Sequence, residues 1–498
     1  MKERGRAEQW LRRGIAICED LLARARRDIV RLSDDPDPAW TEMERRFDEY
    51  TMGTGSRIGP GELVERLAGC QVVMVGGVST SPHGIELVGR LMERLRGCAV
   101  ALNVPSCERQ PELDRFLEGR IALPDLHGAL DFDACAPEHV WPVYRRFLER
   151  ARVARVPVVL YESGVSQAVE GRDADSLLLL DAALHVHSER PLIVLTGELR
   201  ATPESLLGGV QRQHGADRVA ALYCDLPGPY FSDLLDGGSG RGWFALRPGR
   251  WCECRQSPLA RLQSFLSFHA LYEIPVRGDR LSVIVPAMVK RIARALGLSM
   301  PAVPRVGVLG PGDPRLLSLA SACNGIDDEG LEFLAQCMAA GESRMIPEAG
   351  LLYVGNVATG HVAEEAAHWL RSLTGGHGYC TEGEDAFWGV AVHELLAWYG
   401  SKVLSPGRVP PGISDLGPGE GTRGEALAHV YGYNLAERLY SASSDAAVRD
   451  WVRAAFQQDL VERGTAKRLY LAGLDLAARS ARSRRSGRKA PAGERKGR

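Results

Sequence analysis

The stretch Gln71–Ser81, QVVMVGGVSTS, decides the fold, because it combines a buried strand, a glycine pair and a helix start. The apolar residues Val72–Val75 predict a strand buried on both faces, and Gly76–Gly77 predict the tight turn that ends it. Ser81 and Pro82 suit the N-cap and the first position of a following helix. In an open α/β sheet, ligands lie at the carboxyl ends of strands, so a binding site is expected at this turn.

The chain has 498 residues, too many for one ordinary core, so two domains are expected. The formal net charge is −2, so the folded domains show no charge signature of nucleic-acid or anionic-lipid binding. The exception is the basic stretch 479–498, which predicts a disordered tail. Such a tail is either simply solvated or a tether to nucleic acid or membrane.

The cysteines and the N-terminus indicate the compartment. Eleven cysteines are scattered without a CxxC pair, which indicates reduced, mostly packed thiols. The N-terminus, MKERGRAEQW, has no apolar signal core, and no apolar run approaches the ~20 residues that span a bilayer. We expect a soluble, cytoplasmic protein without a membrane span, and the abundance of Arg, Ala and Gly is typical of a GC-rich bacterium.

Apolar strands alternate with helical patterns through the first half of the chain. This alternation predicts a Rossmann-like α/β fold, in which helices cover both faces of a mainly parallel sheet. A hairpin at the sheet edge is predicted from Trp243–Leu246 and Trp251–Cys254. The other predicted strands are Val72–Val75, Ala99–Val104, Val156–Tyr161, Leu192–Thr196 and Val219–Tyr223.

Four segments follow from these patterns: a helical N-terminal segment (1–50), the α/β domain (51–275), a mostly helical domain (276–478) and the tail (479–498). A change in composition near Tyr272–Leu281 marks the main boundary. Within the helical domain, short strands are predicted at Arg305–Leu309, Arg344–Ile346 and Leu351–Val354, and helices at Val357–Leu373, Glu384–Leu404, Arg423–Ser441 and Ala446–Ala477.

An ordered series of segments follows the Val72–Gly77 strand. It comprises LNVPSCERQPELDRFLEG (Leu102–Gly119), WPVYRRFLERARVARVPVVLY (Trp141–Tyr161), GRDADSLLLLDA (Gly171–Ala182), LIVLTGELRATPESL (Leu192–Leu206), ALYCDLPGPYFSDL (Ala221–Leu235) and WCECRQSPLARLQSFLSF (Trp251–Phe268). In this order the series resembles the ChaN-like family of haem-binding uptake proteins, within the Tiki superfamily. The closest resemblance is to a long bacterial branch with a helical C-terminal region.

The resemblance implies a haem or metal site of imidazoles and carboxylates at the strand ends. At the family's ligand positions this sequence has Gly77, Ser79, Asn103, Glu198 and Arg200. Gly, Ser and Asn are not tight ligands of a metal ion or a haem iron, and the fixed charge of Arg200 repels a cation. We therefore expect a degenerate, non-catalytic site that binds an unknown small ligand or protein.

Two further interpretations of this region remain open. His83, four residues after Ser79, either replaces a lost imidazole or is a surface histidine, and we expect the latter. Ser79–Ser81 at a helix N-terminus, with Arg200 nearby, either receive an anion or simply cap the helix. We expect an ordinary cap, with Arg200 paired to Glu198 or exposed to solvent.

The segment HVAEEAAHWL carries a second candidate site. On one helix, His361, Glu364, Glu365 and His368 share an arc of ~100°. His and Glu spaced by three or four residues are typical of helical metal sites. The alternatives are a buried polar network and the solvated face of an amphipathic helix.

The next predicted helix, Glu384–Leu404, is apolar on nearly every face and carries Glu394. A buried carboxylate needs a partner, and antiparallel packing would bring Glu394 near His368. The candidate ligands for a divalent metal or haem are therefore His361, Glu365, His368 and Glu394. His393 is not among these candidate ligands, because it is rotated by 100° from Glu394 around the helix.

No catalytic signature stands out. GGVSTS has neither the GK[ST] ending of a P-loop nor the GxGxxG of a dinucleotide fold, and no GxSxG elbow is present. The leading hypothesis is a divergent, non-catalytic ChaN-like binding protein. The alternatives are a metal-dependent hydrolase or haem-binding protein that uses the C-terminal ligands, and a purely structural module.

Overall fold

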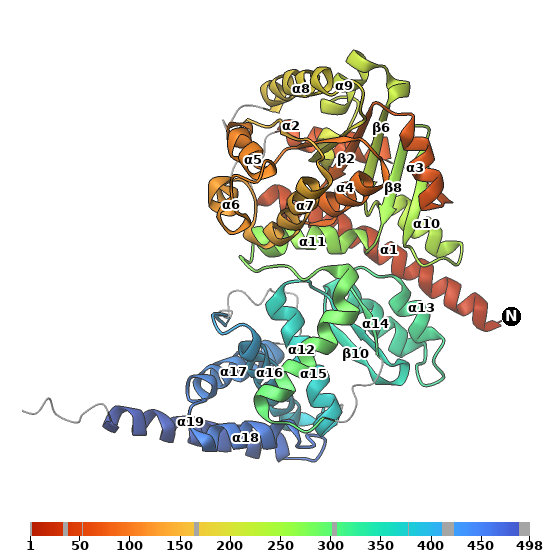
Figure 1. Cartoon of the computed structure of the whole chain (residues 1–498). Coiled ribbons are helices and arrows are strands. Elements are labelled where there is room, and N and C mark those ends of the chain that lie inside the picture. The colour runs from red at the N-terminus through yellow and green to blue at the C-terminus, as the bar shows by residue number, and fades with distance from the viewer. Residues whose placement is uncertain are drawn as a thin grey trace, which may run out of the picture. The chain divides into compact units, whose positions relative to one another are not determined.

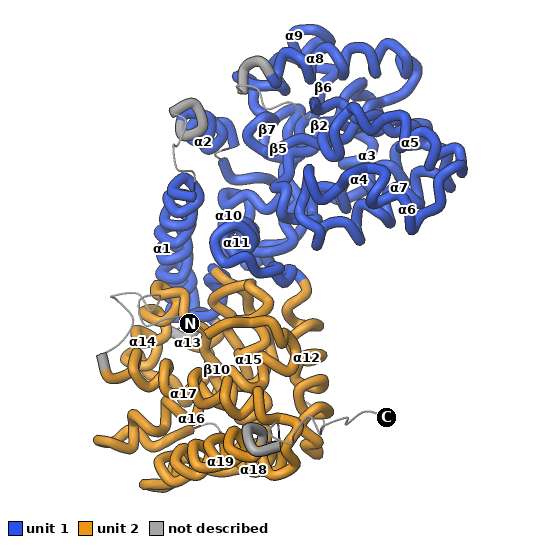
Figure 2. Tube along the Cα trace, turned by 90° about the vertical axis from the view of Figure 1, so that its left-hand side faces the viewer, with its two compact units in different colours: residues 1–279, 312–318 blue, residues 280–311, 319–498 orange. Residues whose placement is uncertain are grey.

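The computed structural model describes residues 2–32, 38–51, 53–163, 169–300, 306–376, 378–410 and 423–487. The chain forms two compact units, which are coloured separately in Figure 2. Unit 1 comprises residues 1–279 and 312–318, and unit 2 comprises residues 280–311 and 319–498. Unit 1 is an α/β domain and unit 2 is mostly helical (Figure 1), so the predicted fold class is confirmed.

Unit 1 is built on an eight-stranded sheet in the order β1-β7-β8-β6-β2-β5-β3-β4. The strands from β8 to β4 in this order run parallel, whereas β7 is antiparallel to both of its neighbours. Every residue of β2 and β6 is buried, as expected for a sheet covered on both faces. The strands are β1 (Ser56–Ile58), β2 (Val72–Gly77), β3 (Ala99–Leu102), β4 (Val158–Leu160), β5 (Leu192–Gly197), β6 (Val219–Cys224), β7 (Gly242–Arg247) and β8 (Arg250–Cys254).

The face of the sheet that each helix of unit 1 covers depends on the direction in which the chain moves across the sheet. The path from β2 through β3 to β4 runs one way, and the path from β4 through β5 and β6 to β8 returns. Right-handed crossovers therefore place α4–α7 on one face and α8–α10 on the other. The helices are α1 (Lys2–Arg31), α2 (Pro38–Thr51), α3 (Pro60–Ala68), α4 (His83–Arg94), α5 (Gln110–Leu117), α6 (Leu123–Ala129), α7 (Trp141–Ala154), α8 (Val169–Val186), α9 (Leu206–His214), α10 (Pro227–Leu235) and α11 (Pro258–His269).

The glycine pair does not end the first long strand as predicted. Strand β2 continues through both glycines, and Gly77 pairs with Gly197 of β5. The glycines are required by close packing: a Cβ on Gly76 would lie 3.1 Å from the Cα of Glu198, and one on Gly77 would lie 3.2 Å from the Cα of Gly84. Because these two glycines have no side chain, the backbone at Glu198 and Gly84 can pack closely against β2.

The following helix begins later than predicted. Helix α4 starts at His83, with Pro82 as its N-cap. Ser81 instead lies in a turn, where its backbone N–H donates to the carbonyl oxygen of Val78 at 2.9 Å. The predicted helix start is therefore one residue early, but Ser81 does cap the first turn, since its Oγ accepts a hydrogen bond from the backbone N–H of His83 at 3.4 Å.

The predicted hairpin is formed by β7 and β8, but it does not lie at the sheet edge. Strand β1, Ser56–Ile58, pairs outside β7 and forms the edge. Sequence analysis missed β1 because only three residues form it, too few for an apolar alternation.

Unit 2 combines helices with a three-stranded sheet in the order β10-β11-β9. The strands β10 and β11, which match two of the predicted short strands, pair in antiparallel orientation. The strands are β9 (Gly307–Leu309), β10 (Arg344–Ile346) and β11 (Leu351–Tyr353), and the helices are α12 (Leu281–Leu296), α14 (Asp328–Ala340), α15 (Thr359–Gly375), α16 (Gly383–Leu404), α17 (Arg423–Ser441), α18 (Ala446–Phe456) and α19 (Thr465–Gly487). Helix α13 (Arg315–Ser321) contains the division between the units.

The end of the chain differs in part from the expected tail. Helix α19 continues to Gly487, so the first part of the stretch 479–498 is helical, and 488–498 lie outside the described residues. Among the helices of the described residues, none has the length and apolar character to cross a membrane.

Candidate functional site

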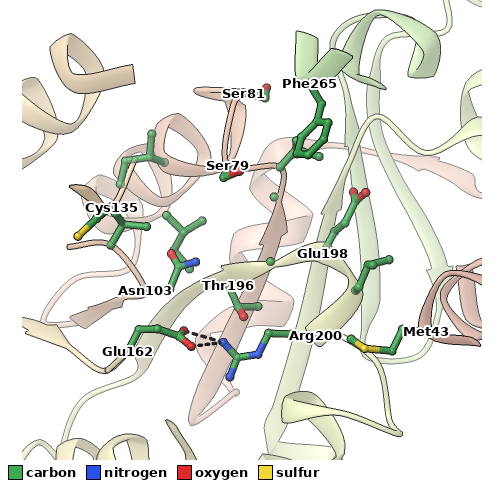
Figure 3. Close-up of a pocket in the computed structure, with 18 of the residues that line it drawn as sticks. Met43, Ser79, Ser81, Asn103, Cys135, Glu162, Thr196, Glu198, Arg200 and Phe265 are labelled. Atoms are coloured by element: carbon green, nitrogen blue, oxygen red, sulfur yellow. Dashed lines mark hydrogen bonds and ion pairs between the residues drawn. The ribbon is translucent and has the colours of Figure 1, made fainter. Parts of the chain in front are cut away.

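A cavity of about 400 Å³ lies at the carboxyl ends of β2, β3 and β5 (Figure 3). These strands are neighbours in the sheet, so the residues that follow them meet at one edge. The four residues predicted for a ligand site, Ser79, Asn103, Glu198 and Arg200, all line this cavity. Sequence reasoning thus brought together residues that lie far apart in the chain.

Arg200 is held by acidic residues that sequence analysis did not assign to it. Its Nη1 donates to both carboxylate oxygens of Glu162, at 2.6 and 2.8 Å (Figure 3), and its Nε donates to Asp173 at 2.7 Å. Its Nη2 donates to the hydroxyl of Ser176 at 2.9 Å. The expectation that Arg200 pairs with Glu198 or solvent is therefore wrong. Because these carboxylates already neutralise the guanidinium, its charge no longer favours the binding of an anion.

Glu198, the one residue with a metal-binding side chain among the positions that the resemblance implies, also has a partner. Its carboxylate forms an ion pair with Arg261 of α11. Arg261 is almost fully buried, and that burial lowers its pKa to about 9. Removing Glu198 from this pair to bind a metal would leave a buried guanidinium without its counter-charge, which is costly.

The residues of the cavity do not fit the metal or haem site that the resemblance implies. Among the described residues that line the cavity, none is a histidine, and both strand-end carboxylates, Glu162 and Glu198, are paired with arginines. Of the lining residues whose types ligate haem iron, Met43 and Cys135 lie on opposite sides of the view in Figure 3. Tyr144 keeps its proton because burial raises its pKa.

His83 is buried, so the expected surface histidine is wrong. Its Nδ1 lies 2.9 Å from Asp225 and its Nε2 lies 2.7 Å from Glu253. Burial alone lowers the pKa of His83, but its neighbours Cys224 and Asp225 outweigh burial and raise the pKa well above its usual value. Both nitrogens are at hydrogen-bond distance from carboxylates, so no metal with bonds of about 2 Å fits between them. The sequence signal for this contact was Glu253, an acidic residue that is buried in β8 with its neighbours and therefore needs a partner.

In unit 2, helices α15 and α16 run antiparallel. The start of α15 lies near the residues that follow α16, since Arg408 donates to the carbonyl oxygen of Gly360, and His368 lies near Glu394. The distance from His368 Nε2 to Glu394 Oε1 is 3.8 Å, close to what antiparallel packing predicted. The other two candidates, His361 and Glu365, are not in the group of ligand atoms that lie within 4.8 Å of one another. His361 Nε2 is hydrogen-bonded to Ser343 Oγ at 2.9 Å. Burial, with the nearby Glu364 and Glu394, raises the pKa of Glu365 well above its usual value.

His393 joins His368 and Glu394, whereas the predicted His361 and Glu365 do not. One ligand atom from each of His368, His393 and Glu394 lies within 4.8 Å of the other two. The two imidazole rings are stacked, with centroids 3.9 Å apart, and burial lowers the pKa of both histidines. The 100° rotation between His393 and Glu394 did not separate them, because His368 from the facing helix approaches both.

Comparisons with known proteins find only one distant structural similarity for this chain. No family model matches the sequence, and no curated protein matches it. Among solved structures, the chain is similar to ChaN of Campylobacter jejuni, in a structure described as showing cofacial haem binding. That match has 12% sequence identity and a TM-score of 0.26, and it covers 34% of this chain and 88% of ChaN. A relationship this distant carries no argument, so function is argued from the geometry.

Proposed function

We propose that unit 1 is a non-catalytic, ChaN-like binding domain that takes a small organic ligand into the cavity at the ends of β2, β3 and β5. The observation that carries this proposal is the combination of a cavity of about 400 Å³ with strand-end charges that are already paired. Pockets for small organic molecules have volumes of roughly 300–1,000 Å³.

The lining indicates the chemistry of the ligand. Leu195, Leu262 and Phe265 supply apolar surface, and Ser79 and Asn103 supply uncharged polar groups. A ligand with an apolar body and a few hydrogen-bonding groups suits this lining, since burial of apolar area supplies most of the affinity and the polar groups fix orientation. A strongly charged ligand suits it less, because it would compete with existing ion pairs.

A screen of small organic fragments by ligand-observed NMR on the full chain tests the proposal. The exposed Ser79 at the cavity is changed to Trp to fill it, and the exposed Ser188, outside the cavity lining, is changed to Trp as a matched control. We expect fragments that bind the unmodified chain and Ser188→Trp but not Ser79→Trp. If no fragment is sensitive to Ser79→Trp, the cavity is not a binding site.

The alternative function, a metal-dependent hydrolase or haem-binding protein in unit 2, has one supporting observation. His368 and Glu394 approach within 3.8 Å, but His361 and Glu365 do not join them. The four residues predicted from the sequence therefore do not make a common site, and catalysis is not part of this proposal.

A further inference from the structure

A second cluster in unit 2 is not used by the proposed ligand cavity. His368 comes from α15, and His393 and Glu394 come from α16. One ring nitrogen from each histidine and one carboxylate oxygen lie within 4.8 Å of one another. This is the one such group of three or more ligand-type residues that the described part of the chain contains.

The distance between His368 and Glu394 is close to that of a metal site. Zinc binds imidazole nitrogen and carboxylate oxygen at about 2.0–2.2 Å, so tetrahedral ligand atoms lie about 3.3 Å apart. The measured separation of His368 Nε2 and Glu394 Oε1, 3.8 Å, is longer than that by about half an ångström. A shared ion also requires the two stacked rings, whose planes differ by 21°, to tilt so that a nitrogen of each points at it.

The opposite side of Glu394 is held in the way that metal-binding carboxylates are held. Its Oε2 accepts a hydrogen bond from the hydroxyl of Tyr433 at 3.3 Å, and His429 Nδ1 lies 3.6 Å away. Both partners belong to α17. Such outer contacts orient a carboxylate and leave its other oxygen for the ion. The partly exposed His429 marks where an ion could enter.

Simple packing leaves part of the cluster unexplained. The Nδ1 atoms of His368 and His393 are buried and have no hydrogen-bond partner among the described residues. Buried polar atoms in native proteins nearly always have a partner. The positive charge of Arg371 opposes a cation, but its guanidinium is directed to the carbonyl oxygens of Gly376 and Gly378.

We infer that His368, His393 and Glu394 form a binding site for a divalent transition metal of the zinc class. Two imidazoles and one carboxylate suit Zn²⁺ and Co²⁺ better than the all-oxygen ions Mg²⁺ and Ca²⁺. Three protein ligands leave the fourth position of a tetrahedral site to water or another small ligand.

The test uses the untagged full chain, because the sequence already contains 12 histidines. The protein is stripped with chelator and titrated with Co²⁺, followed by visible absorption, and with Zn²⁺, followed by equilibrium dialysis and elemental analysis. We expect one metal ion per chain and the intense visible bands of tetrahedral Co²⁺. Absence of stoichiometric binding by the unmodified chain overturns the inference, whatever the variants do.

Variants then locate the ion. His368→Gln combined with His393→Gln, and separately Glu394→Gln, should each weaken binding at least tenfold. His361→Gln is the matched control, since it changes another histidine of the same helix that bonds to Ser343, and binding should be unchanged. Circular dichroism confirms folding. Retention of the ion by the folded double variant, or equal loss in His361→Gln, contradicts the assignment.

Discussion

Arg200 shows how one residue changes the chemistry of a strand end. The resemblance implies a histidine at this position, and the ion pairs of Arg200 neutralise Glu162 and Asp173, whose negative charge a metal ion would need. Glu198 is used in the same way by Arg261. The carboxylates are therefore present near the cavity, but they hold the protein together and do not present free ligand atoms.

At the same scale, His83 predicts a pH dependence of stability. Its pKa in the folded protein lies well above the unfolded value, so its contribution is complete below an unfolded pKa of about 6.5 and is lost as pH rises through the folded pKa. We expect His83→Gln to lower the free energy of unfolding by about 3–5 kcal/mol at pH 6, because Asp225 and Glu253 lose a buried counter-charge.

Chemical denaturation of the two proteins between pH 6 and pH 10 measures this difference. The difference between unmodified chain and variant should shrink towards the alkaline end. A difference that stays constant over the whole range would show that His83 is not held as a cation.

Glu365 gives a second prediction, of opposite sign. Its folded pKa is raised, so the folded state keeps a proton that the unfolded chain releases above about pH 4.5. Stability therefore falls as pH rises above that value, and Glu365→Gln should remove the loss. The gain of the variant over the unmodified chain should grow by up to about 1.4 kcal/mol per pH unit until the folded pKa is passed.

The neighbouring Glu364 is the control for this experiment, because it has the same side chain on the same helix. It forms an ion pair with Arg408 at 2.8 Å, so Glu364→Gln should destabilise the protein at neutral pH. Thermal denaturation from pH 5 to pH 8 compares the variants. If Glu365→Gln and Glu364→Gln lose stability alike, Glu365 is an ordinary ionised carboxylate.

At the scale of elements, unit 2 depends on close approach between helices. A Cβ on Gly432 of α17 would lie 2.5 Å from the carbonyl oxygen of Ala391 in α16, and one on Gly400 would lie 2.5 Å from the Cβ of Ala367 in α15. These glycines let α17 and α15 pack directly on α16. The same packing brings Tyr433 to Glu394.

Gly432→Ala should therefore destabilise unit 2 by about 1–3 kcal/mol, because the backbone oxygen of Ala391 cannot move aside without shifting a helix. The control is Gly407→Ala, where an added Cβ meets nothing within 4 Å, and a change below about 0.5 kcal/mol is expected. Thermal unfolding followed by circular dichroism measures both. Equal stability of the two variants would contradict this packing.

The elements that sequence analysis predicted well are those with a continuous apolar run. Leu192–Thr196 and Val219–Tyr223 match β5 and β6 to within one residue at their ends, because strands buried on both faces carry apolar residues throughout. Ser56–Ile58 was missed, since its pairing with β7 depends on tertiary contacts and not on a local pattern. The end of β2 was misplaced because glycines there serve close packing, which the sequence does not distinguish from a turn.

At the scale of the whole molecule, the sequence predicted which residues lie together better than it predicted their hydrogen-bond partners. The resemblance implied that Ser79, Asn103 and Arg200 share one edge of the sheet, and all three line the cavity there. The partner of Arg200 could not be predicted, because Glu162 follows β4 and its approach depends on side-chain packing. His393 was not predicted as a ligand because it is rotated by 100° from Glu394 on their helix, and its stacking on His368 depends on how the two helices pack.

A haem titration of the full chain, followed by visible absorption, tests most directly whether the strand-end cavity lacks residues that coordinate a metal. The unmodified chain, Ser79→Trp, and the double variant His368→Gln with His393→Gln are compared. We predict that the cavity supplies no axial ligand, so Ser79→Trp leaves the Soret band of the haem–protein mixture unchanged. A stoichiometric Soret shift that Ser79→Trp abolishes and the double variant retains would contradict this account.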